Sequence, residues 1–363
     1  MKIDIITINK KNIYYNFSFI FTKKINLIKD RFAFSLLFVI QKFSKKIMGF
    51  YNMKVFRKIS QINLTEFENK KRFLTIGAFD GIHLGHRVLI DRIKDLSQKE
   101  NGISVVFTFS NHPLEALASY YAPEYLSLPD EKIKIFEELG IDILVMPVFN
   151  KSIANLSPQK FIEQILVEKL NVSGVVCGFD FKFGKGGKGN VEILKEFGSK
   201  HGFFVEVIEP FKIYDQIISS THIRELIKEG DVDIAAKYLT RPYCLKGKVE
   251  KGFGIGKTLG YPTANICTSK NVVIPGSGVY IVEILIENNK YKGMLNIGQN
   301  PTFPEKCFSI EVNIFDYNNS LYGKEISVNF LKRIRDEIKF DNKEKLIEQI
   351  KIDEETANAF FKQ

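Results

Sequence analysis

The pattern of hydrophobicity changes about two thirds of the way along the chain, and this change limits the folds that the chain can adopt. Between residues 73 and 210, short apolar stretches alternate with longer amphipathic stretches of helical period. The predicted strands are Phe73–Ala78, Ser104–Phe109, Ile143–Pro147, Gly174–Gly178 and Phe204–Ile208, and the predicted helices lie near 84–98, 129–139, 158–170 and 190–200. Strands that alternate with helices pair in parallel, so we predict an α/β Rossmann-like domain: a parallel sheet with helices on both faces.

The later part of the chain predicts a different architecture. A helical pair over 219–239 ends at Arg241-Pro242, a plausible boundary, and short alternating strands with Gly, Asn and Pro turns then run from Tyr243 to Phe330. This pattern favours a small closed β-barrel. Two amphipathic helices, 342–350 and 354–362, close the chain. We therefore expect one domain at 53–240 and another at 241–363, preceded by an N-terminal extension at 1–52.

The extension carries most of the basic charge. Its balance is +8 of a total of +10, so the body is close to neutral, and we expect no nucleic-acid partner. Its longest apolar stretch, Phe32–Ile40, is far shorter than the ~20 residues that span a bilayer, so we expect no membrane partner. A transit peptide is one alternative, but the extension is rich in Lys rather than Arg. We expect instead that translation starts at Met48 or Met53, with the first strand about 20 residues later and no motif before it.

The cysteines bear on the compartment. Cys177, Cys244, Cys267 and Cys307 are widely spaced and form no CxxC pair. This spacing is typical of thiols in a reduced cytoplasmic protein.

A glycine-rich turn with two histidines follows the first predicted strand, at Ile76–His86. Gly77 and Gly81, on either side of Phe79, let backbone N–H groups approach an anion, and the helix that follows adds the positive end of its dipole. His83 and His86 share one face of the first helical turn. Imidazoles there can bind nucleotide phosphates and stabilise the charge that develops when an α-phosphorus is attacked, which is nucleotidyl transfer. A zinc pair or two surface histidines are the alternatives.

A second motif, Ile218–Arg224, opens a predicted helix. Ser219, Ser220 and Thr221 occupy its N-cap and first turn, where hydroxyl and N–H groups face an anion, although an ordinary helix cap has the same composition. Arg224, one turn later, can reach a β- or γ-phosphate as a fork. Together the two motifs resemble the HxGH and ISSTxxR signature of the α/β-phosphodiesterase nucleotidyltransferases.

A third motif lies in the barrel-like part, at 247–265. It contains Gly252, Gly254 and Gly256, and then Thr263 and Asn265, whose oxygens suit Mg²⁺ beside a phosphate. An irregular run of β-turns is the alternative. Over its whole length the motif resembles the glycine loop and PTAN motif of riboflavin kinases.

With these motifs in one chain and in this order, residues 53–363 resemble the bacterial bifunctional riboflavin kinase/FMN adenylyltransferases. The resemblance implies a nucleotidyltransferase domain followed by a kinase barrel with a C-terminal helix, in the cytoplasm. It also implies phosphorylation of riboflavin to FMN and adenylylation of FMN to FAD, with ATP as co-substrate and Mg²⁺ in both steps. The expected partners are riboflavin, FMN and ATP, and a weak homo-oligomer is left open.

The resemblance also implies roles for three further residues. Glu311 is implied as the base that takes the ribityl hydroxyl proton, the alternative being a surface strand residue. Arg335 is implied to contact the flavin of the kinase site, the alternative being a solvated charge run at 332–339. Asp180 is implied to bind flavin or nucleotide in the N-terminal pocket. Asp80 receives no catalytic role.

The chain departs from the family pattern at Ser110, Asn111, Lys257 and Asn313. These departures bear on the fine positioning of the sites and remove none of the residues assigned to chemistry. Two other functions stay open. One is a pantetheine- or glycerol-phosphate-type nucleotidyltransferase with an added barrel, and the other is a flavin-sensing protein without catalysis.

Overall fold

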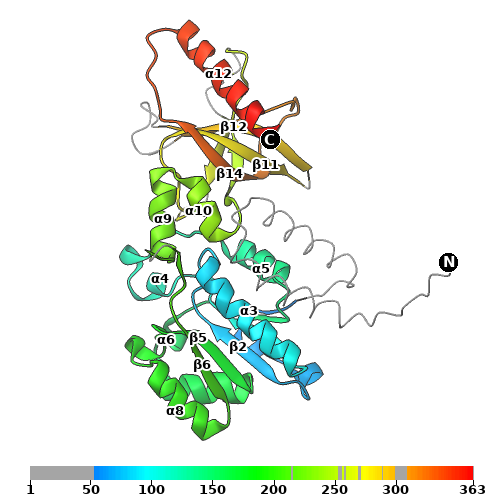
Figure 1. The fold of residues 1–363 in the computed structure, drawn as a ribbon, viewed down its shortest axis with the longest axis vertical. Coiled ribbons are helices and arrows are strands. Elements are labelled where there is room, and N and C mark those ends of the chain that lie inside the picture. Colours follow the sequence, from blue (N-terminus) through cyan, green and yellow to red (C-terminus); the bar gives the residue numbers. More distant parts are fainter. Residues whose placement is uncertain are drawn as a thin grey trace, which may run out of the picture. The chain divides into compact units, whose positions relative to one another are not determined.

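The structure is a computed structural model, and it describes residues 53–213, 216–251, 256, 259–268, 271–287, 289–298 and 309–362. Met53–Gln363 forms one compact unit (Figure 1). The expected extension at 1–52, the two phosphate-loop glycines Gly252 and Gly254, and Lys257 and Cys307 lie outside the described residues.

Within the described residues, the N-terminal part of this unit contains a six-stranded parallel sheet in the order β1-β4-β3-β2-β5-β6. Its strands are β1 Lys54–Phe56, β2 Arg72–Ile76, β3 Ile103–Phe107, β4 Ile143–Val145, β5 Gly174–Gly178 and β6 Phe204–Ile208. The predicted parallel sheet is confirmed. The expectation that the first strand begins about 20 residues after Met53 is wrong, because β1 pairs with β4. Three residues are too few to show a hydrophobic period.

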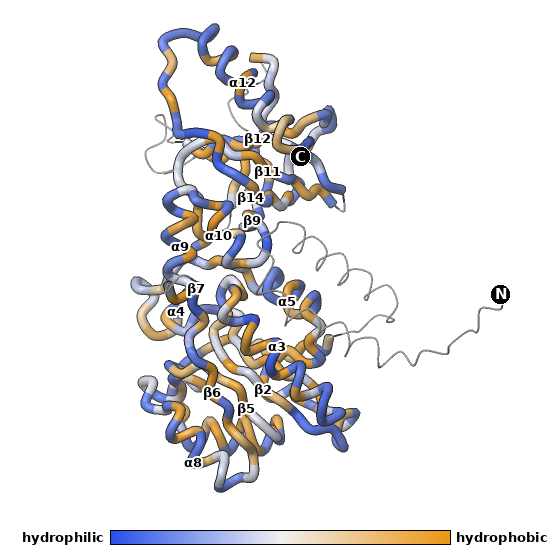
Figure 2. The backbone as a smooth tube through the Cα atoms, viewed as in Figure 1, coloured by the Kyte–Doolittle hydropathy of each residue, from blue (hydrophilic) through white to orange (hydrophobic). Residues whose placement is uncertain are grey.

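Helices cover both faces of this sheet. The longer ones are α3 Leu84–Lys99, α5 Pro129–Glu138, α7 Pro158–Phe161 with the π-helix Ile162–Lys169 that continues it, and α8 Val191–His201. On β3, Val106 packs in one hydrophobic cluster with α3 and α5, whereas Val105 and Phe107 pack in another with the π-helix and α8. Successive residues of a strand point to opposite faces, so this alternation shows that both faces are buried. In Figure 2, α3 carries both hydrophilic and hydrophobic colours, as a helix with one buried face does.

Shorter elements connect these layers. They are the 3-10 helices Ile59–Gln61, Thr65–Phe67, Ser119–Tyr121 and Lys185–Gly187, the helices α4 Pro113–Leu117 and α6 Lys151–Ala154, and the strand pair β7 Lys212–Ile213 and β8 Gln216–Ile217. The helical pair predicted at 219–239 is α9 Ser220–Glu229 and α10 Val232–Leu239.

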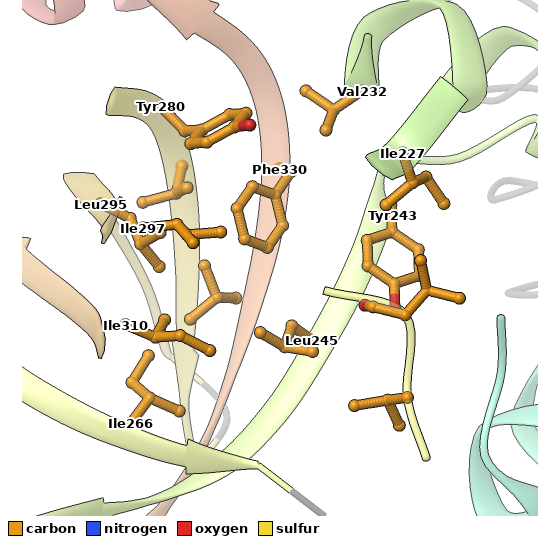
Figure 3. Packing of buried hydrophobic residues seen from close by; sticks show 14 of the residues in the cluster. Ile227, Val232, Tyr243, Leu245, Ile266, Tyr280, Leu295, Ile297, Ile310 and Phe330 are labelled. Atoms are coloured by element: carbon orange, nitrogen blue, oxygen red, sulfur yellow. The ribbon is translucent and has the colours of Figure 1, made fainter. Parts of the chain in front are cut away.

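The C-terminal part contains a closed antiparallel barrel in the order β10-β13-β12-β11-β14-β9, which confirms the predicted barrel. Its strands are β9 Tyr243–Glu250, β10 Ala264–Thr268, β11 Gly278–Ile286, β12 Asn289–Gly298, β13 Ser309–Ile314 and β14 Glu325–Arg335. The barrel interior is filled by large side chains such as Tyr243, Tyr280 and Phe330 (Figure 3). Ile227 of α9 and Val232 of α10 belong to the same cluster, so the helical pair and the barrel share one core.

A single helix, α12 Lys343–Phe361, ends the described chain. The expectation of two helices, 342–350 and 354–362, is wrong. The residues between them contain no Gly or Pro to stop a helix, and Asp353 is buried in an ion pair with Arg335 of β14. Asn342 caps the helix by accepting the N–H of Lys345 at 2.9 Å. None of the helices in the described residues is long and apolar enough to cross a membrane.

Candidate active sites

The glycine-histidine turn lies where β2 ends, at the point where the strand order changes direction. Strands β3 and β5 flank β2, and ligands of such sheets bind beyond the carboxyl ends of the strands at this point. The turn has left-handed backbone at Phe79 (φ 48°), Gly81 (φ 77°) and Ile82 (φ 44°). A Cβ on Gly81 would lie 2.9 Å from Leu126, so both the backbone angle and the space require glycine. The side chains of Phe79 and Ile82 are fully buried, and their packing stabilises the turn.

The two histidines stack on each other at the start of α3. Their ring centroids lie 3.7 Å apart at 21°, and His83 is the N-cap of the helix. The ring of Phe79 packs edge-on against His86, with centroids 5.1 Å apart. Phe79 is therefore a core residue, and any contact with ATP would come from its backbone.

Burial keeps both imidazoles uncharged. It lowers the pKa of His83 to about 4 against an opposing effect of Asp80, and it lowers the pKa of His86 well below 6.5, with smaller contributions from His83 and Lys132. The Nδ1 atoms of both rings are buried and have no hydrogen-bond partner among the described residues. Buried polar atoms normally have partners, so this pair is suited to binding a ligand. The described residues contain no group of three or more His, Cys, Asp or Glu side chains suited to a metal ion.

The second motif meets this turn in space. Ser219 is the N-cap of α9 and accepts the N–H of His222 at 3.2 Å, as predicted. Ser220 donates through Oγ to the carbonyl of Asp80 at 2.9 Å. Thr221, one residue on, is exposed at the first turn. The N-terminus of α9 and the histidine turn, 140 residues apart, therefore lie together and form a region with groups suited to binding an anion.

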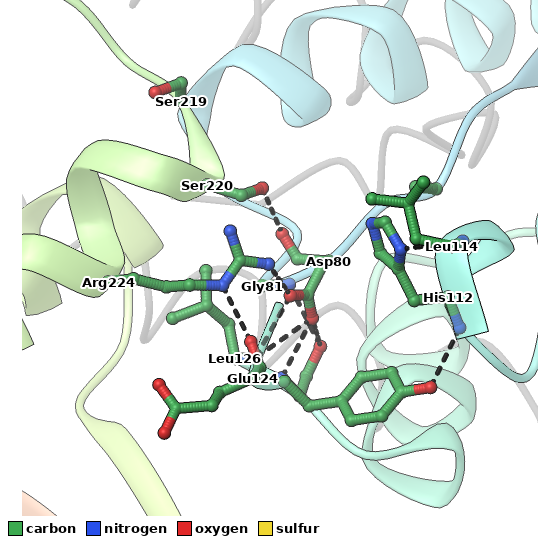
Figure 4. A network of polar contacts seen from close by, with 12 residues as sticks. Asp80, Gly81, His112, Leu114, Glu124, Leu126, Ser219, Ser220 and Arg224 are labelled. Carbon is green, nitrogen blue, oxygen red and sulfur yellow. Dashed lines mark hydrogen bonds and ion pairs between the residues drawn. The ribbon is translucent and has the colours of Figure 1, made fainter. Parts of the chain in front are cut away.

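Arg224 is already engaged within this region. Its Nη2 lies 2.5 Å from Oδ2 of Asp80, and its Nε donates to the carbonyl of Glu124 at 2.7 Å (Figure 4). The exposed fractions of the two side chains of the ion pair are 12% and 5%. The guanidinium of Arg224, which the sequence predicts to bind a phosphate, thus has two of its three nitrogens hydrogen-bonded to protein groups.

The third motif forms a second polar site on the barrel. Strands β10 and β13 pair so that Asn265 lies opposite Glu311. Thr263, just before β10, donates through Oγ1 to Oε2 of Glu311 at 3.1 Å. A Cβ on Gly256 would lie 2.9 Å from Oγ1 of Thr263 and 2.3 Å from the carbonyl of Tyr261, so glycine is required there. Side-chain oxygens of three residues gather here, a donor set that fits Mg²⁺.

The two residues expected at the flavin lie in different parts of the fold. Asp180 is exposed just beyond the carboxyl end of β5, at the same sheet edge as the histidine turn. Arg335 ends β14 and binds Asp353 of α12 through both oxygens, with Nη2 2.7 Å from Oδ2 and Nε 3.0 Å from each oxygen. The guanidinium of Arg335 is thus bound to the C-terminal helix and is no solvated charge.

Three of the departures from the family pattern make contacts in the structure. Asn111 pairs with the backbone of Phe149, accepting its N–H at 2.7 Å and donating to its carbonyl at 3.0 Å. Asn313 donates to the carbonyl of Pro262 at 2.8 Å, next to Thr263. Ser110 contributes its backbone N–H to the carbonyl of Pro147 at 3.1 Å. These contacts hold the segments beside each site.

Three residues of the N-terminal site were missed. Asp80 accepts a hydrogen bond from Arg224. Buried Lys132 of α5 donates to the carbonyl of Ala78 at 3.0 Å, and Arg241 donates to the carbonyl of Gly81 at 2.8 Å. Each contact joins residues at least 54 positions apart. No local pattern in the sequence marks such contacts, and Lys132 itself lies among other charged residues of α5.

Family models match both parts of the chain. A model described as FAD synthetase matches residues 65–222, and one described as riboflavin kinase matches residues 239–361.

Curated relatives match nearly their whole length. The chain is 38% identical over 304 residues to the bifunctional riboflavin kinase/FMN adenylyltransferase of Bacillus subtilis (strain 168), covering 82% of this chain and 95% of that one. It is 36% identical over 310 residues to the protein of the same name from Escherichia coli (strain K12), covering 85% and 98%. A protein of that name from Buchnera aphidicola subsp. Schizaphis graminum is 39% identical over 321 residues, covering 87% and 99%.

One solved structure also has a similar fold. A Streptococcus pneumoniae protein described as a macrolide-efflux protein has a TM-score of 0.76 and 33% identity, and the match covers 84% of this chain and 98% of that one.

Proposed function

The chain belongs to the family of bifunctional riboflavin kinase/FMN adenylyltransferases, and from that premise we propose which of its residues carry the two reactions. One reaction transfers the γ-phosphoryl group of ATP to riboflavin, which gives FMN and ADP. The other transfers the AMP part of a second ATP to FMN, which gives FAD and pyrophosphate. The observation that carries the assignment is that two separate polar sites lie in the two matched regions: the stacked histidines, and the contact between Thr263 and Glu311.

We assign adenylylation to residues 53–240 and riboflavin phosphorylation to residues 241–363. The α/β architecture of the first region, the barrel of the second and the ranges of the two family models support this division.

In the adenylyltransferase site, His83 and His86 act as neutral hydrogen-bond donors to the phosphates of ATP. They stabilise the negative charge that grows as the FMN phosphate attacks the α-phosphorus and pyrophosphate leaves. Gly77 and Gly81 let the backbone at Phe79 approach the phosphates closely, although their own N–H groups bond to the carbonyl of Phe107 at 3.2 Å and to Oγ of Ser127 at 3.0 Å. The α9 N-terminus at Ser219, Ser220 and Thr221 adds N–H and hydroxyl donors. Arg224 binds the outer phosphates, and Asp180 contacts FMN or the nucleotide from the same edge of the sheet.

In the kinase site, Glu311 accepts the proton of the ribityl hydroxyl as this oxygen attacks the γ-phosphorus. Thr263 and Asn265 would hold Mg²⁺, whose charge offsets that of the phosphates. Gly256 keeps the approach to Thr263 open, with Gly252 and Gly254 beside it in the predicted phosphate loop. Arg335, bound to Asp353, contacts the flavin.

We further infer a cytoplasmic location. The described cysteines, Cys177, Cys244 and Cys267, are free thiols, which supports a reduced compartment. A weak homo-oligomer stays a prediction.

Two single substitutions, each directed at one site, test the proposal. Riboflavin or FMN is incubated with ATP and Mg²⁺, and the flavins are separated by chromatography. His86→Ala should lower FAD formation from FMN by about 10² to 10³-fold and leave FMN formation intact, because one preorganised donor is lost from one site. Glu311→Gln keeps the shape of the side chain but removes the base, so it should abolish FMN formation and leave FAD formation from FMN intact.

The same assay separates the alternatives. Equal loss of both activities in either variant contradicts two independent sites. Near-normal FMN formation by Glu311→Gln means that Glu311 is a structural strand residue. A wild-type chain that binds flavin but forms neither product is a flavin-sensing protein. Chelation of Mg²⁺ should stop both reactions.

A further inference from the structure

Asp80, the acidic residue of the glycine-histidine turn, has a defined structural role, although the sequence around it does not indicate one. We propose that Asp80 is a positioning residue for adenylylation: it holds Arg224 so that one nitrogen of the guanidinium stays directed at the polyphosphate of ATP. The inference rests on the proposed role of Arg224 as a phosphate ligand.

The carboxylate of Asp80 is saturated by protein donors. Its Oδ1 accepts the backbone N–H groups of Leu126 and Ser127, each at 3.1 Å, and its Oδ2 accepts the N–H of Leu126 at 3.1 Å and Nη2 of Arg224 at 2.5 Å. Asp80 is 4% exposed. A buried carboxylate with these four contacts has no open side for a metal ion or for a proton taken from substrate. Its oxygens are used to fix the groups around it.

Arg224 is held along two edges by this arrangement. Asp80 binds Nη2, and the carbonyl of Glu124 binds Nε at 2.7 Å. The carboxylate of Glu124 pairs with Lys228, one turn further along α9, which ties the same segment to the helix. Two contacts on different nitrogens prevent the guanidinium from rotating, so less side-chain entropy is lost when a phosphate binds.

The segment Glu124–Ser127 therefore fixes the side chains of both Asp80 and Arg224. It provides the carbonyl for Arg224 and the N–H groups for Asp80, and Oγ of Ser127 accepts the N–H of Gly81 at 3.0 Å. Figure 4 shows the Asp80 carboxylate between Arg224 and the backbone of Leu126, with the carbonyl of Glu124 at Nε of Arg224. This segment therefore couples the position of Arg224 to the conformation of the glycine-histidine turn.

The third nitrogen of the guanidinium remains for a ligand. Among the described residues no hydrogen bond is made by Nη1 of Arg224, and Figure 4 draws none on it. Ser219 and Ser220, at the N-terminus of the same helix, lie one turn before it and mark where an anion binds. Arg224 therefore presents only the N–H groups of Nη1 to the phosphates, in a fixed orientation, whereas the sequence predicts a guanidinium free to bind through two nitrogens.

Asp80→Asn is the first test. It preserves the size of the side chain and replaces an anionic oxygen facing Arg224 by an amide. We expect the KM for ATP in FAD formation from FMN to rise by about tenfold or more, the effect of losing one hydrogen bond between charged groups. FMN formation from riboflavin by the same molecule should be unchanged, which also shows that the chain is folded.

A double-mutant cycle tests whether Asp80 acts through Arg224. The cycle compares Asp80→Asn, Arg224→Ala and the double variant. If Asp80 only positions Arg224, Asp80→Asn should change the KM for ATP by less than about twofold once Arg224 is absent. Multiplicative effects of the two substitutions would overturn the proposal. So would a shift in the Mg²⁺ concentration needed for half-maximal adenylylation in Asp80→Asn, since that would make Asp80 a metal ligand.

A second variant covers the case in which Asp80→Asn fails to fold. Arg224→Lys keeps a cation to pair with Asp80 but has a single nitrogen, so it should fold with the wild-type thermal midpoint and raise the KM for ATP. A wild-type KM in Arg224→Lys contradicts the proposal. The matched control is Glu206→Gln, which breaks the ion pair of Glu206 with Arg92 (Nε to Oε1, 2.7 Å) between β6 and α3. Its KM for ATP should not change.

The outcomes distinguish this inference from the function on which it rests. A wild-type chain that makes no FAD from FMN contradicts the proposed function. A wild-type chain that makes FAD while Asp80→Asn folds and keeps its KM for ATP contradicts only the role of Asp80.

Discussion

At the residue scale, the two histidines of the glycine-histidine turn illustrate how burial sets the protonation state of a side chain. An exposed imidazole titrates near pH 6.5, but the pKa of His83 is lowered to about 4 and that of His86 is lowered well below 6.5, in both cases mainly by burial. Both rings therefore stay neutral at physiological pH. A neutral imidazole donates one N–H and brings no charge, so the positive charge at this site comes from the basic side chains of Arg224, Lys132 and Arg241 and from the helix N-terminus.

These pKa values predict how stability depends on pH. Between about pH 4 and 6.5 the unfolded chain binds a proton at residue 83 and the folded chain does not, so the free energy of unfolding should fall as the pH is lowered through this window. Denaturant unfolding of the wild type and of His83→Gln at pH 7 and pH 5 measures this effect. The variant should lose less stability on acidification than the wild type. An identical loss in both proteins would show that His83 is not buried in its neutral form.

At the element scale, β1 shows how much a three-residue strand can contribute. Its ends are tied by hydrogen bonds, from the N–H of Lys54 to Asp142 at 2.9 Å and from the N–H of Met146 to Phe56 at 2.8 Å. Met53 and Phe56 are 9% and 6% exposed and pack in the two clusters on either side of the sheet. The strand therefore closes one edge of the sheet although it lies only just after the extension.

Two shortened chains test this contribution. A chain beginning at Met53 should fold and keep both activities, because it retains β1. A chain beginning at Ser60 lacks β1 and should lose about 2 to 3 kcal/mol of stability, mainly from the exposed partners of Phe56. Thermal unfolding of the two chains measures the difference. Equal midpoints would mean that β1 is dispensable, and an insoluble chain from Met53 would mean that residues 1–52 pack on the body.

At the scale of the whole molecule, α9 and Arg241 relate the two parts of the unit. The N-terminus of α9 contacts the glycine-histidine turn. At the other end of this helix, the carbonyl of Glu229 accepts a hydrogen bond from Arg333 of β14 at 3.4 Å. Arg241, between α10 and β9, is half-buried and donates to the carbonyl of Gly81 at 2.8 Å, while its Nη2 lies 3.8 Å from Glu131. Arg241, which precedes the barrel strands, thus stabilises the glycine-histidine turn of the N-terminal part.

Arg241→Met should therefore impair adenylylation more than riboflavin phosphorylation. The substitution keeps much of the side-chain volume but leaves the carbonyl of Gly81 without this donor and the half-buried carboxylate of Glu131 without its cation. We expect about a tenfold loss of kcat/KM for FAD formation, measured beside FMN formation in the same preparation. Arg333→Met, which breaks a contact between α9 and the barrel away from Gly81, is the control. Similar losses in both variants would indicate a general effect on packing.

The sequence by itself determined the architecture, and it supplied the residues that we propose for the two sites. Alternating apolar strands and helices predict the parallel sheet, the short strands after Tyr243 predict the barrel, and the motifs around His83, Ser219 and Thr263 predict where phosphates bind. These signals are local: hydrophobic period and capping residues act over a few positions, so they can be recognised without the fold.

Only the tertiary structure decided which groups meet. The pairing of β1 with β4, of Arg224 with Asp80 and of Arg335 with Asp353 joins residues whose neighbours in sequence carry no sign of the partner. A charged side chain is buried only where an opposite charge or a hydrogen-bond partner arrives from elsewhere, and that arrival depends on how whole elements pack. For the same reason Asp80 looks like an ordinary turn residue in the sequence, whereas in the fold its carboxylate holds Arg224.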